Sequence, residues 1–285
     1  MPQETKHSFI RPKTEPIPTA PDEATPISLH RLSGKSKEFL HLLSYLLLPI
    51  DLLVKFGIDP ITLRNKAGEI MVEVAHSEDG TIWGMRLQND IDRRDPLIEI
   101  EMIDTLFGRI SVTWVGMNDP RAPRFDIDHL PNGDLTLRGK ASRNLTTEAA
   151  ALVAGLAPGQ VRRGLGSFSR LLNDLEQFFA CLHFYEFEVE PLYYHNAILF
   201  ERHGFQYVQG KRFMQRIHEG FSPGGVYQQR LDNSTPFRDP AQADSIRGRS
   251  WAIHDGILDE TWDRIKLIKR IGVLADSNTA PDLGW

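Results

Sequence analysis

A group of acidic, phenolic and imidazole side chains follows one predicted strand, and these are the side chains best suited to acid–base chemistry. The strand covers residues 184–190 and ends at Glu190, and Tyr194 and His195 come shortly after it. Histidine titrates near neutral pH, so His195 is a candidate general base, and Glu190 is another if burial raises its pKa. The competing interpretation is structural: Tyr194 packs on the sheet and His195 caps the next helix.

A second pair of carboxylates lies earlier in the chain. Asp126 and Asp128 share one face of a strand predicted near residues 124–130, so both can point into the same space. Such a pair can serve acid–base catalysis or bind a cation, although a solvated strand face is the commoner explanation. No histidine spacing typical of a metal site accompanies these carboxylates or Glu188 and His195, so no metal is expected.

A glycine-rich stretch offers another kind of chemistry, the binding of a phosphate. It opens a helix that apolar spacings of three and four predict over residues 161–180. Free N–H groups in a first turn, the helix dipole and two arginines suit a pyrophosphate. Alternatively, the arginines are solvated and the glycines allow close packing of helix and sheet. The stretch consists of Val161, Arg162, Arg163, Gly164, Leu165 and Gly166.

Residues 158–214 resemble the GCN5-related N-acetyltransferase (GNAT) superfamily. Val189-Glu190-Pro191 and the segment from Asn196 to Phe205 are similar to the family's second motif, and the glycine loop matches the first motif in part. The resemblance implies acetyl-CoA or another acyl-CoA, with its pyrophosphate on the amides of residues 161–166 and Asn196 near the pantetheine arm. Phe200 stands where the family often has a tyrosine acid, so Tyr194 is the candidate to protonate the leaving thiolate.

Two functional hypotheses follow. In the first, the protein is an acyl-CoA-dependent N-acyltransferase acting on an unknown amine, with open amides in the glycine loop and a cleft between strand 184–190 and strand 124–130. In the second, it is a non-catalytic GNAT-like protein that binds a hydrophobic or anionic small molecule. That hypothesis expects a covered glycine loop and a pocket under Trp83 and Trp114.

The elements that must position these residues belong to an α+β fold. Residues 68–139 alternate between apolar and polar side chains and contain a strong turn signal at Asn132-Gly133, which predicts an antiparallel meander of five or six strands. An apolar run over residues 36–57 contains Pro49 and Asp51, so we expect a kinked or split core helix and no membrane span. The fold prediction is a mostly antiparallel twisted sheet with packed helices and a GNAT-like C-terminal half.

The composition of the chain limits the kinds of partner that we expect. The chain has 285 residues and a net charge of −5, which argues against a nucleic-acid partner and favours a small-molecule substrate. Its single cysteine, Cys181, excludes an internal disulfide, fits a cytoplasmic protein and is expected to be buried among apolar neighbours. Helix 36–57 could form a homodimer interface. Four arginines in a loop-rich region could bind an anion, although ion pairs are their commoner fate: Arg230, Arg238, Arg247 and Arg249.

The predicted organisation has four segments. Residues 1–27 form a flexible proline-rich arm without the apolar core of a signal peptide. Residues 28–140 hold the helix and the meander, residues 141–220 the GNAT-like α/β half, and residues 221–285 an irregular extension packed on the core.

Overall fold

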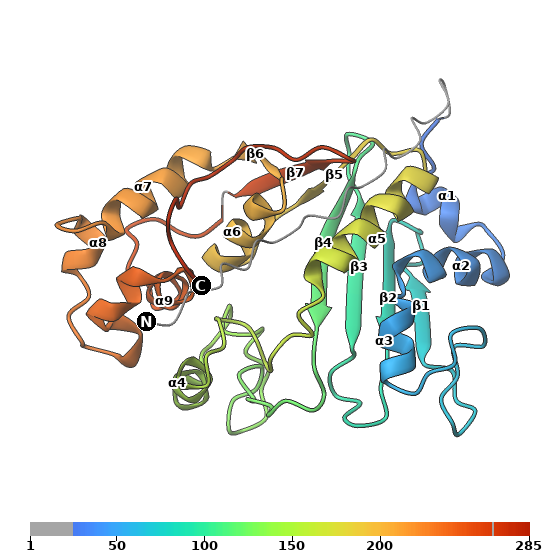
Figure 1. Ribbon diagram of the computed structural model, residues 1–285, viewed down its shortest axis with the longest axis horizontal. Coiled ribbons are helices and arrows are strands. Elements are labelled where there is room, and N and C mark those ends of the chain that lie inside the picture. Colours follow the sequence, from blue (N-terminus) through green and yellow to red (C-terminus); the bar gives the residue numbers. More distant parts are fainter. Residues whose placement is uncertain (1–24, 264) are drawn as a thin grey trace, which may run out of the picture.

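The computed structural model describes residues 25–263 and 265–285, and its centre is a seven-stranded sheet (Figure 1). The strand order is β1-β2-β3-β4-β5-β7-β6, and every neighbouring pair is antiparallel except β4 and β5. This confirms the predicted α+β class with a mostly antiparallel sheet. The strands are β1 (Val72–His76), β2 (Ile82–Leu87), β3 (Ile98–Asp104), β4 (Ile110–Met117), β5 (Glu186–Val189), β6 (Gln206–Gln209) and β7 (Lys266–Arg270).

Helices flank both halves of this sheet, with α5 lying across β3 and β4 and α1–α3 beside it (Figure 1). The predicted arm falls almost wholly on residues 1–24, which lie outside the described residues. The helices are α1 (Leu29–Ser33), α2 (Lys37–Ser44), η1 (Tyr45–Leu47), α3 (Ile50–Lys55), α4 (Leu145–Val153), α5 (Phe168–Cys181), α6 (Tyr194–Arg202), α7 (Lys211–Phe221), α8 (Val226–Gln229), η2 (Pro236–Arg238), η3 (Pro240–Asp244) and α9 (Ile246–His254).

The apolar run over residues 36–57 divides as its proline predicts. Ser36 caps α2 by accepting a hydrogen bond from the Phe39 N–H at 3.2 Å, and Pro49 precedes the first turn of α3. A proline is tolerated at a helix start because it lacks only an N–H that the helix does not use. Among the described residues, no helix combines the length and the apolar character needed to cross a membrane.

The meander is shorter than the alternation pattern predicts. It has the four strands β1–β4, whereas residues 124–130 form no strand and contribute only an isolated bridge between His129 and Leu135. The expectation that Asp126 and Asp128 share a strand face is therefore wrong. Their segment is an irregular loop in which Arg124 binds both carboxylates, and these side-chain bonds replace a strand ladder.

Helix α5 packs aromatic side chains against the sheet. Phe178 packs on Trp83 with ring centroids 5.6 Å apart, and Phe179 packs on Phe187 of β5 at 4.5 Å. The helix begins at Phe168 rather than at residue 161, so the glycine-rich stretch precedes it as a loop. Cys181 at its last turn is exposed, against the expectation that it is buried.

A smaller apolar cluster explains why the helix starts late. Val161 is fully buried in it, and Trp251 of α9 donates a hydrogen bond from Nε1 to the Leu156 carbonyl at 2.8 Å. This packing holds the long connection between β4 and α5, which includes α4, against α9. The buried members are Ile127, Ala151, Leu156, Val161, Phe237 and Trp251.

One glycine in this connection is required by its surroundings. Gly139 has φ +88°, and a Cβ there would lie 2.7 Å from Nε2 of His254 and 2.8 Å from Oε1 of Glu148. The His254 ring cannot move freely, because its Nε2 is hydrogen-bonded to Glu148 at 3.1 Å and the ring packs on Tyr193.

We predict that Gly139→Ala lowers the free energy of unfolding by about 2–5 kcal/mol. A left-handed backbone costs a residue with a Cβ about 1–2 kcal/mol, and overpacking adds about 1–3 kcal/mol. The control is Gly133→Ala, where φ is +90° but no atom lies within 4 Å, so only the backbone cost applies. Urea unfolding measures both, and equal losses would show that the space around Gly139 does not matter.

Candidate functional site

The candidate site lies where β4 and β5 separate. The parallel pairing covers only Ser111 with Glu188 and Val112 with Val189, whereas β4 continues to Met117. An irregularity in the β3–β4 register adds one residue to β4 between Val112 and Trp114, and bulges of this kind bend a strand and re-aim its side chains. In the described chain, no strand pairs with β4 on this side beyond Val112.

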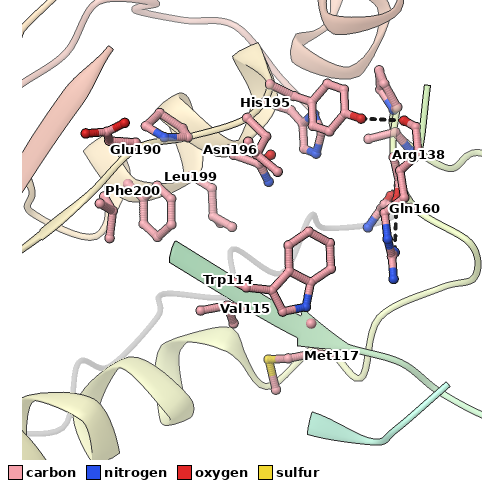
Figure 2. Close-up of a pocket in the computed structure, with 18 of the residues that line it drawn as sticks. Trp114, Val115, Met117, Arg138, Gln160, Glu190, His195, Asn196, Leu199 and Phe200 are labelled. Atoms are coloured by element: carbon pink, nitrogen blue, oxygen red, sulfur yellow. Dashed lines mark hydrogen bonds between the residues drawn. The ribbon is translucent and has the colours of Figure 1, made fainter. Parts of the chain in front are cut away.

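The gap contains a cavity of about 310 Å³ (Figure 2). Trp114 stands up from β4 toward His195 and Asn196 of α6, and Arg138 lies at one side with Gln160. Leu199 and Phe200 add an apolar wall. The cavity thus combines one apolar side with a few convergent polar groups, as small-molecule sites commonly do.

The structure brings some of the predicted site residues together in this cavity and excludes others. Glu190, His195, Asn196 and Arg162 line it, whereas Tyr194 does not. Sequence analysis missed Arg138, Gln160 and Trp285 as lining residues. No local pattern marked Arg138, because its place depends on a backbone with positive φ at both Leu137 and Arg138.

His195 is a buried, neutral member of the site. Its Nδ1 lies 2.9 Å from the Ser250 hydroxyl, and its ring stacks on Tyr193. Burial, with the positive charge of Arg247 nearby, lowers the pKa of His195 from 6.5 to about 3. The imidazole therefore stays uncharged at neutral pH, and the expected near-neutral base is not what this environment produces.

The other two candidates for proton transfer differ from each other. Glu190 is exposed at the end of β5 and forms an ion pair with Lys266 at 2.9 Å, so the burial that the sequence-based hypothesis required is not found. Tyr194 is buried outside the cavity, where burial raises its pKa to about 12. Of the two, only Glu190 is among the residues that line the cavity.

An ion network fixes the wall next to the cavity. Arg162, of whose side chain 2% is exposed, binds Asp95 at 2.8 Å and Asp92 at 2.7 Å. Arg124 binds Asp95 at 2.9 Å and Asp128 at 2.6 Å. Arg162 and Asp128 are therefore structural partners within one network, and the network accounts for their burial without a ligand.

The rest of the glycine loop is accessible. Arg163 and Gly166 are exposed, and Gly164 and Leu165 are half-buried. Within the described residues, the N–H groups of residues 163–166 donate no hydrogen bond to the chain, and α5 has no side-chain cap. Val161 is the exception, since it is buried and its carbonyl accepts from the Phe125 N–H.

Comparisons with known proteins found no relative of this chain. No protein-family model, no curated protein and no solved structure matches it. The geometry of the site is thus the basis for any statement on function.

The ion network predicts that Arg162 acts on stability. Arg162→Met removes one of the two buried arginines that bind Asp95 and leaves Asp92 only the exposed Arg94, and breaking such a buried pair costs up to about 3–5 kcal/mol of unfolding free energy. Arg163→Met, its exposed neighbour, should change it by about 0.5 kcal/mol or less. Thermal or urea unfolding compares the two, and a stable Arg162→Met protein would contradict the structural role.

The lowered pKa of His195 predicts acid sensitivity. Because the folded state holds the ring neutral, the unfolded state binds more protons below pH 6.5, and stability is lost as the pH falls from 6.5 toward 3. At pH 5 the loss from this one group is about 2 kcal/mol relative to pH 7. We predict that His195→Gln removes this part of the pH dependence in urea unfolding. If His195→Gln loses as much unfolding free energy between pH 7 and pH 5 as the wild type does, the ring is protonated in the folded state at pH 5.

Proposed function

We propose that this protein is a GNAT-like N-acyltransferase that uses an acyl-CoA and an amine. The observation that carries the proposal is the cavity between β4 and β5, which opens beside the accessible glycine loop and contains Asn196. The cleft lies between β4 and β5, so the expectation that residues 124–130 form its other wall is wrong.

The glycine loop supports a place for the donor's pyrophosphate. Free N–H groups at residues 163–166 and the uncapped start of α5 supply partial positive charge, and Arg163 supplies a full charge. From there the pantetheine arm would run along the unpaired edge of β4. Extended backbone of that kind can bond an amide-containing chain as an added strand would.

The chemistry is direct transfer within a ternary complex. The amine nitrogen bonds to the acyl carbon, the carbon–sulfur bond breaks, and CoA leaves as a thiolate. The amine must lose a proton, and Glu190 at the end of β5 is the carboxylate that lines the cavity. Asn196 and the neutral ring of His195 can hydrogen-bond the reacting groups without carrying charge.

One observation favours the alternative, a non-catalytic GNAT-like protein that binds a hydrophobic or anionic small molecule. Phe200 lines the cavity in the place of the family's acid, and Tyr194 cannot replace it from its buried position. The cavity does not lie under Trp83, however, since that ring is buried against Phe178. The alternative therefore keeps the same cavity and differs in the ligand that it binds and in the absence of turnover.

Calorimetry with acetyl-CoA and with CoA tests the acyltransferase proposal, because the alternative does not require CoA. We expect micromolar affinity, and a large loss in Gly164→Glu, because a carboxylate in the loop repels the pyrophosphate. Gly34→Glu at the end of α1 is the matched control, since its added Cβ would meet only a carbonyl oxygen at 3.7 Å.

Absence of binding at millimolar ligand would contradict the proposal. Release of free CoA thiol in the presence of amines then separates the enzyme from the binding protein. Turnover that Glu190→Gln lowers at least tenfold, with CoA affinity unchanged, supports the enzyme.

A further inference from the structure

We propose that the cavity recognises an acceptor that carries an oxyanion, a carboxylate or a phosphate, through Arg138 and Arg247. This inference rests on the acyltransferase proposed above and names the class of its second substrate. Both arginines line the cavity, although they are more than 100 residues apart in the chain.

In the part of the chain that the structure describes, neither arginine has a carboxylate partner. Arg138 donates one hydrogen bond to the Gly159 carbonyl at 3.2 Å and lies over the Trp114 ring at 4.6 Å. Arg247 is half-buried in the first turn of α9, and within the described residues it makes neither an ion pair nor a hydrogen bond. A half-buried guanidinium without an anion keeps its charge and its donors for a bound anion.

The other three arginines of the same region have partners within the protein. Arg230 pairs with Asp259 and Arg238 pairs with Asp255, whereas Arg249 donates to the Ala243 carbonyl at 2.7 Å. The structure thus accounts for three of the four arginines that the sequence offered as anion ligands. Arg247 is the one whose charge remains available, and it is also the one that lines the cavity.

The rest of the polar lining also suits an anion. His195 is 95% buried and uses Nδ1 for Ser250, so Nε2 is left for a molecule in the cavity. The Ser250 hydroxyl oxygen accepts from the backbone N–H of His195 at 3.4 Å, and its own proton can be donated to Nδ1, an arrangement in which the ring proton lies on Nε2. With the ring proton on Nε2, His195 adds a neutral N–H donor to the two guanidinium groups, and such a set suits carboxylate or phosphate oxygens.

The net charge around the cavity agrees with this assignment. Lys140 stands beside it, with Nζ bonded to the Leu192 carbonyl at 2.6 Å and placed 4.3 Å from the centre of the Tyr193 ring. Glu190 is the one carboxylate side chain in the lining, and Lys266 neutralises it. The exposed amides of the glycine loop are outside the lining, so the phosphates of an acyl-CoA have a separate place and do not need Arg138 or Arg247.

The test compares probes of one shape that differ in charge: phenylacetate, phenyl phosphate and the neutral phenylacetamide. Calorimetry on the whole chain should show at least tenfold tighter binding of a charged probe than of the amide. Arg247→Gln and Arg138→Gln should each weaken the charged probe at least tenfold and leave the amide unchanged. Arg212→Gln on α7, exposed and outside the cavity lining, is the matched control and should bind as the wild type does.

The two charged probes distinguish the source of the anion. Preference for phenylacetate supports a carboxylate acceptor, and preference for phenyl phosphate supports a phosphate acceptor. Equal binding of charged and neutral probes would overturn the inference. So would a loss of probe affinity in Arg212→Gln as large as in Arg247→Gln.

CoA affinity, measured in the same proteins, separates this inference from the proposed function. We expect Arg138→Gln and Arg247→Gln to keep wild-type affinity for CoA. If they lose it, the two arginines serve the donor, and the acceptor assignment is overturned. If the wild type distinguishes charged from neutral probes but does not bind CoA, the anion site is supported while the acyltransferase is contradicted.

Discussion

The parallel pairing of β4 with β5 ends after two residue pairs, and the rest of the candidate site depends on that separation. Past Val112 the edge of β4 loses its neighbour, although its backbone groups still need partners. The extra residue in β4 at this point bends the strand away. A sheet that stayed paired along β4 would leave no cavity between Trp114 and α6.

The walls of the cavity come from distant parts of the chain that are held by buried contacts. On one side, Arg162, Arg124 and Asp95 fix the loop that follows β4. On the other side, α6 lies against α9, where Ser250 orients His195. These contacts hold both walls in place without a ligand, and preorganisation of that kind favours affinity.

Local patterns in the sequence predicted most of the framework. Alternating residues predicted the antiparallel strands β1–β4, Pro49 predicted the division of the first long helix, and apolar spacing predicted α5. They misplaced the start of α5 by seven residues, because glycines and arginines before a helix look like its first turn. What removes Val161 and Arg162 from that turn is burial against Trp251 and pairing with Asp95, and neither partner is near them in the chain.

The candidate site was predictable only in part for the same reason. Asn196 and Glu190 follow a strand end, which is a local signal, and both line the cavity. The roles of His195 and Arg247 depend on what surrounds them: burial holds the His195 pKa near 3, and Arg247 differs from its neighbours only in lacking a partner. Arg138 enters through an unusual backbone conformation that no residue pattern indicates.

A crystal structure of the protein with bound CoA tests the central claim most directly, because the claim concerns where a ligand lies. The account predicts the pantetheine chain between β4 and Asn196, with the pyrophosphate against the N–H groups of residues 163–166 and β4 still separated from β5 past Val112. CoA bound elsewhere on the chain, or bound with the gap between β4 and β5 closed, would contradict it.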